Sequence, residues 1–289
     1  MNNPIVSIIM CYRFRVDENR HSIRKFIESI DKYFPDKEKI EILIKLDNDD
    51  NYGRQVISEL ITDTAKDPLI KRRWIRTFLS NRWEGRWSIN YAYEYMFPYR
   101  NPNSKFLLFA GDDIYFIRNV MEDIEKHINE EYRILGDYKT VFTPQKYDIV
   151  RDYHSEDWTI RKTFKDLGET QFICSYPIVS TKLVEIIGNL GHTPNMDSAL
   201  GLLNLIVYKK YKISLAKYIP EFLIRNNVEQ WINGVNMIND YSRGFNHTNC
   251  ITDNYLQASS YYFKLMEQSA RNIYLNMKED NVLDCYKIE

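Results

Sequence analysis

Short apolar runs alternate with helical patterns through the first part of this chain. Continuous apolar runs rich in β-branched residues are typical of strands buried on both faces, as in a parallel sheet. Such runs cover Ile5–Cys11, Ile40–Leu46 and Lys105–Ala110, with a less regular run over Lys71–Phe78. Apolar residues at helical spacing lie between them, over Ser22–Phe34, Arg54–Thr64 and Ser88–Phe97. This alternation predicts an α/β domain with a mainly parallel sheet flanked by helices.

The second half of the chain is less regular. Strands are predicted over Thr140–Pro144 and Pro177–Ser180, and a helix over Lys182–Ile187. A further helix is predicted to begin within Thr193–Asp197, where Pro194 suits the first helical position. Beyond Arg225 the sequence becomes polar and aromatic. We therefore expect a domain over residues 1–225 and a helical C-terminal extension, residues 226–289, packed on the core.

The composition narrows the class of protein. With 44% hydrophobic and 14% aromatic residues, the 289-residue chain is expected to fold around a sizeable core. The net charge of −1 gives no support to nucleic-acid binding through phosphate neutralisation. The four cysteines lack CxxC spacing, which argues against a zinc site or a disulfide framework. Without a signal peptide or an apolar run of about 20 residues, the expectation is a cytoplasmic protein with no transmembrane segment, peripheral membrane attachment being left open.

Polar residues follow three of the predicted strands directly. They are Tyr12-Arg13, Asp47-Asn48-Asp49-Asp50 and Asp112-Asp113. In open α/β sheets the ligand crevice lies outside the carboxyl ends of the strands. The three strand ends therefore predict a binding site.

The adjacent carboxylates Asp112 and Asp113 are the sharpest signal. They repel one another unless a cation or hydrogen-bond donors compensate them, and hard oxygen ligands suit Mg²⁺ or Mn²⁺. The alternative is a Gly-Asp-Asp turn in which an aspartate caps the next helix. Asp47 has a similar pair of interpretations: it accepts hydrogen bonds from a nucleobase or a ribose, or it belongs to a solvated loop.

Four further residues have a functional and a structural interpretation. Arg86 and Asn90 flank a helix start, where a guanidinium could hold a diphosphate, although a surface arginine is the commoner case. Asp197 in the first turn of its helix is either a general base or an acid that complements the helix dipole. His247 is either a late metal ligand or a structural histidine.

Several enzyme classes lack their motifs here. No GxxxxGK[ST] loop and no GxGxxG follow the first strand, which argues against P-loop NTPases and Rossmann dehydrogenases. No GxSxG elbow and no HExxH occur either.

Together these segments resemble a GT-A glycosyltransferase, most closely the inverting enzymes of glycosyltransferase family two. Val6–Arg13 resembles the family's opening strand and the turn beside the nucleotide, and Ile42–Asp47 resembles its second strand. Ser88–Ala92 resembles a helix that carries an Asn, and Phe106–Tyr115 resembles the strand leading to the DxD-type metal motif. Asn195–Leu200 resembles the segment with the catalytic aspartate. The resemblance covers about residues 4–225.

The resemblance implies roles for individual residues. Asp113 would ligate the Mn²⁺ or Mg²⁺ bound to the donor diphosphate, and Asp112 would contact ribose or a metal-bound water. Asp197 would be the catalytic base. Tyr12, Arg13, Asp47, Arg86 and Asn90 would contact the donor. The implied reaction moves a sugar from a UDP- or GDP-sugar to a glycan or other acceptor hydroxyl, with inversion.

Two other functions stay open on the sequence. One is a metal-dependent phosphoryl or nucleotidyl transferase that uses the same carboxylates. The other is a non-catalytic carbohydrate- or partner-binding module on a transferase scaffold, because Asn195-Met196 stands where the family usually has an acid before the base. The many tyrosines fit either stacking on sugar rings or a homodimer interface.

Overall fold

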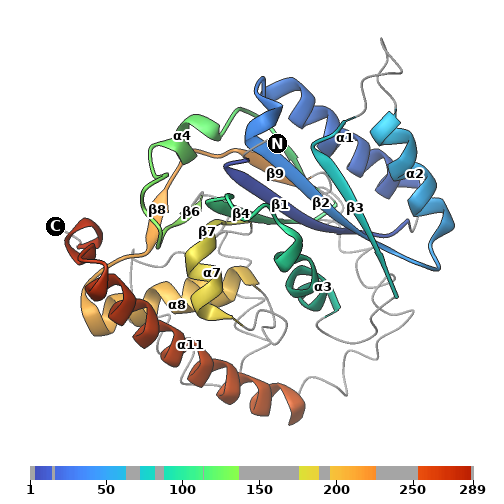
Figure 1. Ribbon diagram of the computed structural model, residues 1–289. Helices are drawn as coiled ribbons and strands as arrows, with labels where there is room; N and C mark the ends of the chain where they lie inside the picture. Colours follow the sequence, from blue (N-terminus) through green and yellow to red (C-terminus); the bar gives the residue numbers. More distant parts are fainter. Residues whose placement is uncertain are drawn as a thin grey trace.

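The computed structural model describes residues 4–14, 17–62, 72–81, 88–112, 114–136, 176–188, 196–225 and 253–287. For residues 17–20, 88–91, 196–198, 224–225 and 253–263 it describes the backbone without the side chains. The strands are β1 (Val6–Tyr12), β2 (Ile40–Asp47), β3 (Ile75–Ser80), β4 (Phe106–Ala110), β5 (Ile114–Phe116), β6 (Ile134–Gly136), β7 (Ile178–Ser180), β8 (Ala216–Tyr218) and β9 (Leu223–Arg225). The helices are α1 (Asp17–Tyr33), α2 (Asn51–Thr62), α3 (Ser88–Met96), α4 (Met121–Glu125), α7 (Thr181–Ile187), α8 (Met196–Tyr211) and α11 (Asp253–Glu279) (Figure 1).

The main sheet has seven strands in the order β3-β2-β1-β4-β7-β6-β8. β1 to β4 run parallel to one another, β7 runs antiparallel to both of its neighbours, and β8 is parallel to β6. β1 and β2 are buried along almost their whole length, as their continuous apolar sequences predict. The predicted mainly parallel sheet flanked by helices is therefore confirmed.

Helices cover both faces of this sheet (Figure 1). α1, α2 and α4 pack on one face, around Phe26, Ile57 and Ile124. α3, α7 and α8 pack on the other, around Met96 and Leu203. Because side chains alternate along a strand, successive residues of β1 and β2 enter the two cores in turn.

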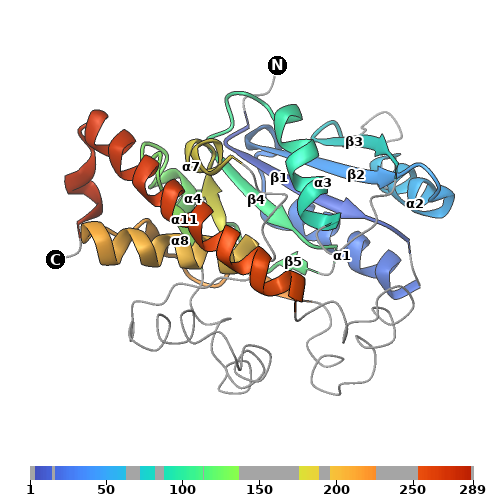
Figure 2. The ribbon, with the colours of Figure 1, turned by 90° about the horizontal axis from the view of Figure 1, so that it is seen from below.

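The C-terminal helix α11 belongs to the second of these cores. Its residues Met266, Ala270, Ile273 and Met277 recur at helical spacing and are almost fully buried in the cluster that holds α7 and α8. Figure 2 shows α11 lying along α8. The expected helical element at the C-terminus is thus present and packed on the core.

One predicted strand begins later than its sequence suggests. β3 begins at Ile75 rather than Lys71, because Arg72 is tied to the end of α2: its N–H donates to Ile61 O at 3.1 Å and its guanidinium donates to Leu60 O. Pairing with β2 then continues to Ser80, opposite Asp47. The strand predicted over Thr140–Pro144 and the proline at position 194 lie outside the described residues.

β5 and β9 form a separate antiparallel ribbon, which the sequence did not predict. Its strands have three residues each, too few for a period to show. Within the described ranges, no helix is long and apolar enough to cross a membrane.

Candidate functional site

The carboxyl ends of β1, β2 and β4 meet at one edge of the sheet, as the strand ends predicted. The chain runs from β1 outward through β2 to β3 and then returns to β4 on the other side of β1. The gap between β1 and β4 is therefore a topological switch point, where open α/β sheets bind ligands. Arg13 follows β1, Asp47 ends β2, and Asp112 lies two residues beyond β4.

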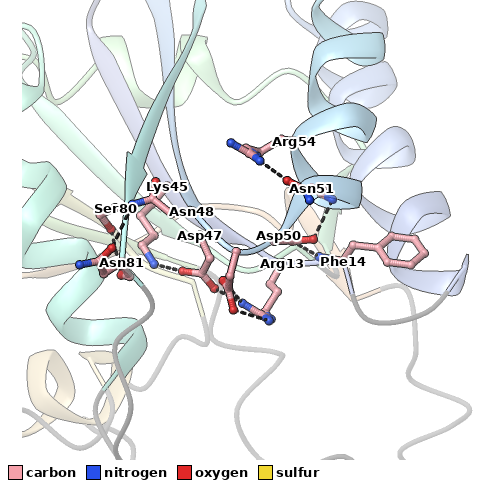
Figure 3. A network of polar contacts seen from close by, with 12 residues as sticks. Arg13, Phe14, Lys45, Asp47, Asn48, Asp50, Asn51, Arg54, Ser80 and Asn81 are labelled. Carbon is pink, nitrogen blue, oxygen red and sulfur yellow. Dashed lines mark hydrogen bonds and ion pairs between the residues drawn. The ribbon is translucent and has the colours of Figure 1, made fainter.

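Arg13 connects the first two strand ends. Tyr12 pairs with Leu46, so Arg13 and Asp47 leave the sheet side by side. Nη1 of Arg13 donates to Asp47 Oδ2 at 2.8 Å and to Asp49 Oδ1 at 2.9 Å, while Nη2 donates to Asp49 Oδ2 at 3.2 Å (Figure 3). The hydrogen bonds that Arg13 donates to Asp49 and, second, to Asp47 raise the pKa of Arg13. Arg13 thus holds the loop after β2 against the end of β1.

Lys45 reaches the same carboxylate from within the sheet. It lies two residues before Asp47 on β2, so both side chains project from the same face. Its Nζ donates to Asp47 Oδ1, and the side chains are 6% and 9% exposed (Figure 3). Lys45 is not among the predicted site residues; the sequence signal that marks it is a lysine inside an apolar strand, two residues before a carboxylate.

Asp50 has a structural role that the sequence reading did not separate from its neighbours. Its buried carboxylate accepts from the N–H of Gly53 at 2.9 Å and from the N–H of Phe14 at 2.7 Å. It therefore caps the first turn of α2 and also fastens the segment after β1 (Figure 3). Of the acids in residues 47–50, Asp50 caps α2, Asp49 pairs with Arg13, and Asp47 pairs with both Arg13 and Lys45 at the end of β2.

Asn48 links the loop after β2 to β3. Its N–H donates to Ser80 O at 2.9 Å, and its side-chain amide donates to Asn81 Oδ1 at 3.0 Å (Figure 3). These bonds extend the β2–β3 pairing beyond Asp47. The chain around Asp47 is thereby held to β3 through Asn48 and to the end of β1 through Arg13.

Asp112 leaves the sheet at the same edge, because Ala110 at the end of β4 pairs with Met10 of β1. The thiol of Cys11, on β1, has its pKa raised to about 12, chiefly by burial. The positive charge of Lys45 opposes this rise, and the negative charges of Asp47 and Asp112 add to it. The strand register, with Tyr12 opposite Leu46 and Met10 opposite Ala110, brings the ends of β1, β2 and β4 to one edge.

The structure places the other predicted residues as follows. Tyr12 is 2% exposed and packs in the core on the α1 face of the sheet. Asn90 lies in the first turn of α3 and Asp197 is the second residue of α8, but their side chains are not described. Arg86, Asp113 and His247 lie outside the described residues. The structure therefore brings together Arg13, Asp47 and Asp112 of the predicted set.

No metal-binding cluster is visible in the part of the chain that the structure describes. No group of three or more His, Cys, Asp or Glu side chains there could hold a metal ion. Asp112 contributes one half-exposed carboxylate at the end of β4. An oxygen ligand in that position suits Mg²⁺ or Mn²⁺.

Comparisons with known proteins give structural likenesses only. No protein-family model and no curated protein sequence match the chain. Staphylococcus aureus TarS is 12% identical with a TM-score of 0.49, over 75% of this chain and 36% of TarS, so this chain spans about a third of that protein. The mannosyltransferase PcManGT from Pyrobaculum calidifontis, in complex with GDP-Man and Mn²⁺, is 10% identical with a TM-score of 0.48, over 96% of this chain and 76% of the other. The galactosyltransferase LgtC is 10% identical with a TM-score of 0.38, over 61% of this chain and 58% of the other. No function is transferred from likenesses at these scores.

Proposed function

We propose that this chain is a glycosyltransferase that moves a sugar from a nucleotide-diphosphate sugar, a UDP- or GDP-sugar, to an acceptor hydroxyl. The observation that carries the proposal is the meeting of Arg13, Asp47 and Asp112 at the switch point between β1 and β4. A crevice there, lined by an oriented carboxylate and a guanidinium, suits a polar nucleotide. The resemblance of these same segments to family-two GT-A enzymes supports it.

The donor would lie across the ends of β1 and β2. Asp47 would accept hydrogen bonds from the nucleobase or ribose, because an ionised carboxylate only accepts. Arg13 would line the nucleotide subsite, chiefly by fixing the loop that carries Asp47. Tyr12, which the sequence predicted to contact the donor, is instead buried in the core on the α1 face of the sheet. Arg86 and Asn90 would face the diphosphate from the start of α3.

A divalent cation would bind beside the diphosphate. Asp112 and Asp113 would hold Mn²⁺ or Mg²⁺, with His247 as a further ligand, and hard oxygen donors fit either ion. Such an ion, when bound, neutralises negative charge on the diphosphate leaving group.

The acceptor would be activated from α8. Asp197, in the first turn of that helix, would remove the proton of the acceptor hydroxyl while the hydroxyl attacks the anomeric carbon. Attack from the face opposite the leaving diphosphate inverts that carbon. The fixed sheet edge contributes to the rate by holding the donor in one orientation.

Thermal unfolding with nucleotides tests the proposal. Wild type, Asp113→Ala and the control Asp284→Ala, whose side chain is 86% exposed at the C-terminus, are melted with UDP, GDP, ADP or CMP, with and without Mn²⁺. A ligand at 100 times its dissociation constant stabilises the folded state by about 2.7 kcal/mol, enough to raise the midpoint by several degrees. We expect one of UDP or GDP to stabilise wild type and the control only with Mn²⁺, and to leave Asp113→Ala unchanged.

The matching nucleotide sugars are then assayed for release of the nucleoside diphosphate with Asp197→Asn as the inactive comparison. No stabilisation by any nucleotide would exclude the proposed donor site. Hydrolysis of a sugar-free phosphoanhydride would indicate a phosphoryl or nucleotidyl transferase instead. Nucleotide binding without turnover over a panel of sugars and acceptors would indicate a non-catalytic module.

A further inference from the structure

The ammonium group of Lys45 is buried within the sheet, where the packing of side chains does not require a charged group. Lys45 is on β2, between β1 and β3, and its side chain is 6% exposed. Its neighbours across the sheet are Cys11 and Phe78, and the preceding residue on its face is Leu43. Removing an ammonium group from water is unfavourable unless a partner compensates it. An apolar side chain of similar length would fill the same space.

Asp47 is a partner of Lys45, and the geometry of that carboxylate is set from two sides. Lys45 Nζ donates to Oδ1, and Arg13 Nη1 donates to Oδ2 at 2.8 Å. One donor comes from within the sheet and the other from the end of the next strand. Each oxygen therefore keeps acceptor capacity for a ligand while the plane of the carboxylate is fixed.

We propose that Lys45 is a positioning residue that sets how the site recognises the nucleoside part of the donor. It neutralises and orients Asp47, which then accepts N–H or O–H groups from the base or ribose. Lys45 acts through Asp47, because its Nζ donates to Asp47 Oδ1 from within the sheet, whereas Asp47 lies at the end of β2. This inference rests on the proposed function, since it requires a nucleotide at the β1–β2 edge.

A competing role can be separated by choice of ligand. Lys45 also lies within electrostatic range of Cys11, together with Asp112, so its charge could instead serve the diphosphate end of the site. Pyrophosphate with Mn²⁺ occupies the diphosphate end and has no nucleoside. A nucleoside diphosphate with Mn²⁺ occupies both ends. The ratio of the two affinities therefore reports on the nucleoside subsite.

The test measures dissociation constants for Mn²⁺-UDP, Mn²⁺-GDP and Mn²⁺-pyrophosphate in wild type and Lys45→Met. Lys39→Met is the matched control: it removes the same group near the start of β2, where Lys39 pairs with Glu125 at 2.6 Å and is 38% exposed. We expect Lys45→Met to weaken the preferred nucleotide about tenfold to a hundredfold, the usual range for losing an orienting partner. Pyrophosphate should bind within about twofold of wild type, and the control should match wild type with all three ligands.

Equal weakening of nucleotide and pyrophosphate, or no change in either, would overturn the inference. If Lys45→Met does not fold because Asp47 loses one of its two cationic partners and keeps only Arg13, Lys45→Met/Asp47→Asn is compared with Asp47→Asn alone. The two should bind the nucleotide equally, because Lys45 would have no carboxylate left to orient; weaker binding by the double variant would contradict the inference. If wild type binds no nucleotide, the proposed function fails and the role of Lys45 fails with it, whereas the outcomes above concern Lys45 alone.

Discussion

Arg13 and Asp47 lie side by side at the ends of two adjacent parallel strands, joined by a 2.8 Å hydrogen bond between Nη1 and Oδ2. The same guanidinium donates twice to Asp49, so the bond joins the segment after β1 to the loop after β2. We expect these hydrogen bonds of Arg13 to matter more for the proposed nucleotide site than for the stability of the fold. Arg13 is 30% exposed and Asp49 is 57% exposed, and ion pairs open to solvent contribute little.

Arg13→Gln should therefore separate binding from stability. We expect the free energy of unfolding to fall by about 1 kcal/mol or less. The affinity for the stabilising nucleotide should fall by about tenfold or more, because the loop that carries Asp47 loses its attachment to β1. Urea unfolding and calorimetric titration measure the two quantities; unaltered nucleotide affinity would show that Arg13 does not organise the site.

Asp50 and Gly53 should be coupled. Asp50→Ala removes the cap of α2 and the acceptor for Phe14 N–H, and should lower the free energy of unfolding by about 1–2 kcal/mol. A Cβ on Gly53 would lie 2.1 Å from Asp50 Oδ2, so Gly53→Ala must displace the same carboxylate. The double variant should therefore be less destabilised than the sum of the single variants. Strict additivity in urea unfolding would contradict this.

The Cys11 thiol should be inert in the folded protein. Burial raises its pKa to about 12, so the nucleophilic thiolate is scarce at neutral pH. At pH 8, mass spectrometry should find iodoacetamide on the exposed Cys285 but not on Cys11, and on both in urea. Because the folded state holds the proton more tightly than the unfolded one, wild type should lose stability relative to Cys11→Ala as the pH rises from about 9 toward 12. Rapid alkylation of Cys11 without denaturant would contradict the assignment.

Tyr286 should matter through its hydroxyl. It is 3% exposed, its Oη accepts from Tyr132 N–H at 3.0 Å, and the Arg133 guanidinium lies 3.9 Å from its ring centre. Tyr286→Phe keeps the ring but leaves a buried N–H without its acceptor, so we expect a loss of about 1–3 kcal/mol in unfolding free energy. Tyr52→Phe, at a residue 70% exposed, is the matched control and should lie within about 0.5 kcal/mol of wild type.

The C-terminal helix should unfold together with the rest of the core. Ile273 is fully buried in α11, and Ile273→Ala should lower the free energy of unfolding by about 2–5 kcal/mol. Leu275→Ala changes a residue of the same helix that is 49% exposed, and should have little effect. A single urea transition, shifted to lower concentration by Ile273→Ala, is expected. A second, separate transition for the helix would show that α11 is not part of the cooperative unit.

The sequence predicted the parts of the fold that local pattern determines. Continuous apolar segments such as Ile40–Leu46 predicted a sheet buried on both faces. The polar residues directly after these segments predicted the edge of the sheet at which Arg13, Asp47 and Asp112 lie. The strand predicted over Pro177–Ser180 is present as β7, but its antiparallel direction depends on long-range pairing that a local pattern does not show. The β5–β9 ribbon was not predicted, because strands of three residues carry no period.

The separate roles of the acidic residues in positions 47–50 could not be predicted from the sequence pattern either. Asp49 and Asp50 have the same chemistry, and only tertiary contacts make one a partner of Arg13 and the other a helix cap. The pattern did not indicate a role for Lys45, because a single lysine inside an apolar strand only interrupts the apolar run. Its meaning comes from the carboxylate two residues later on the same face.

The ribbon of β5 and β9 has a mechanical consequence for the acidic residues after β4. Ala110 is anchored in the main sheet opposite Met10, and Ile114 is anchored to Arg225 more than a hundred positions along the chain. Asp112 thus lies in a short segment that is held at both ends, at Ala110 by pairing with β1 and at Ile114 by pairing with β9. Extra residues inserted between Gly111 and Ile114 would leave the position of Asp112 less restricted without changing the strand pairing of Ala110 or Ile114.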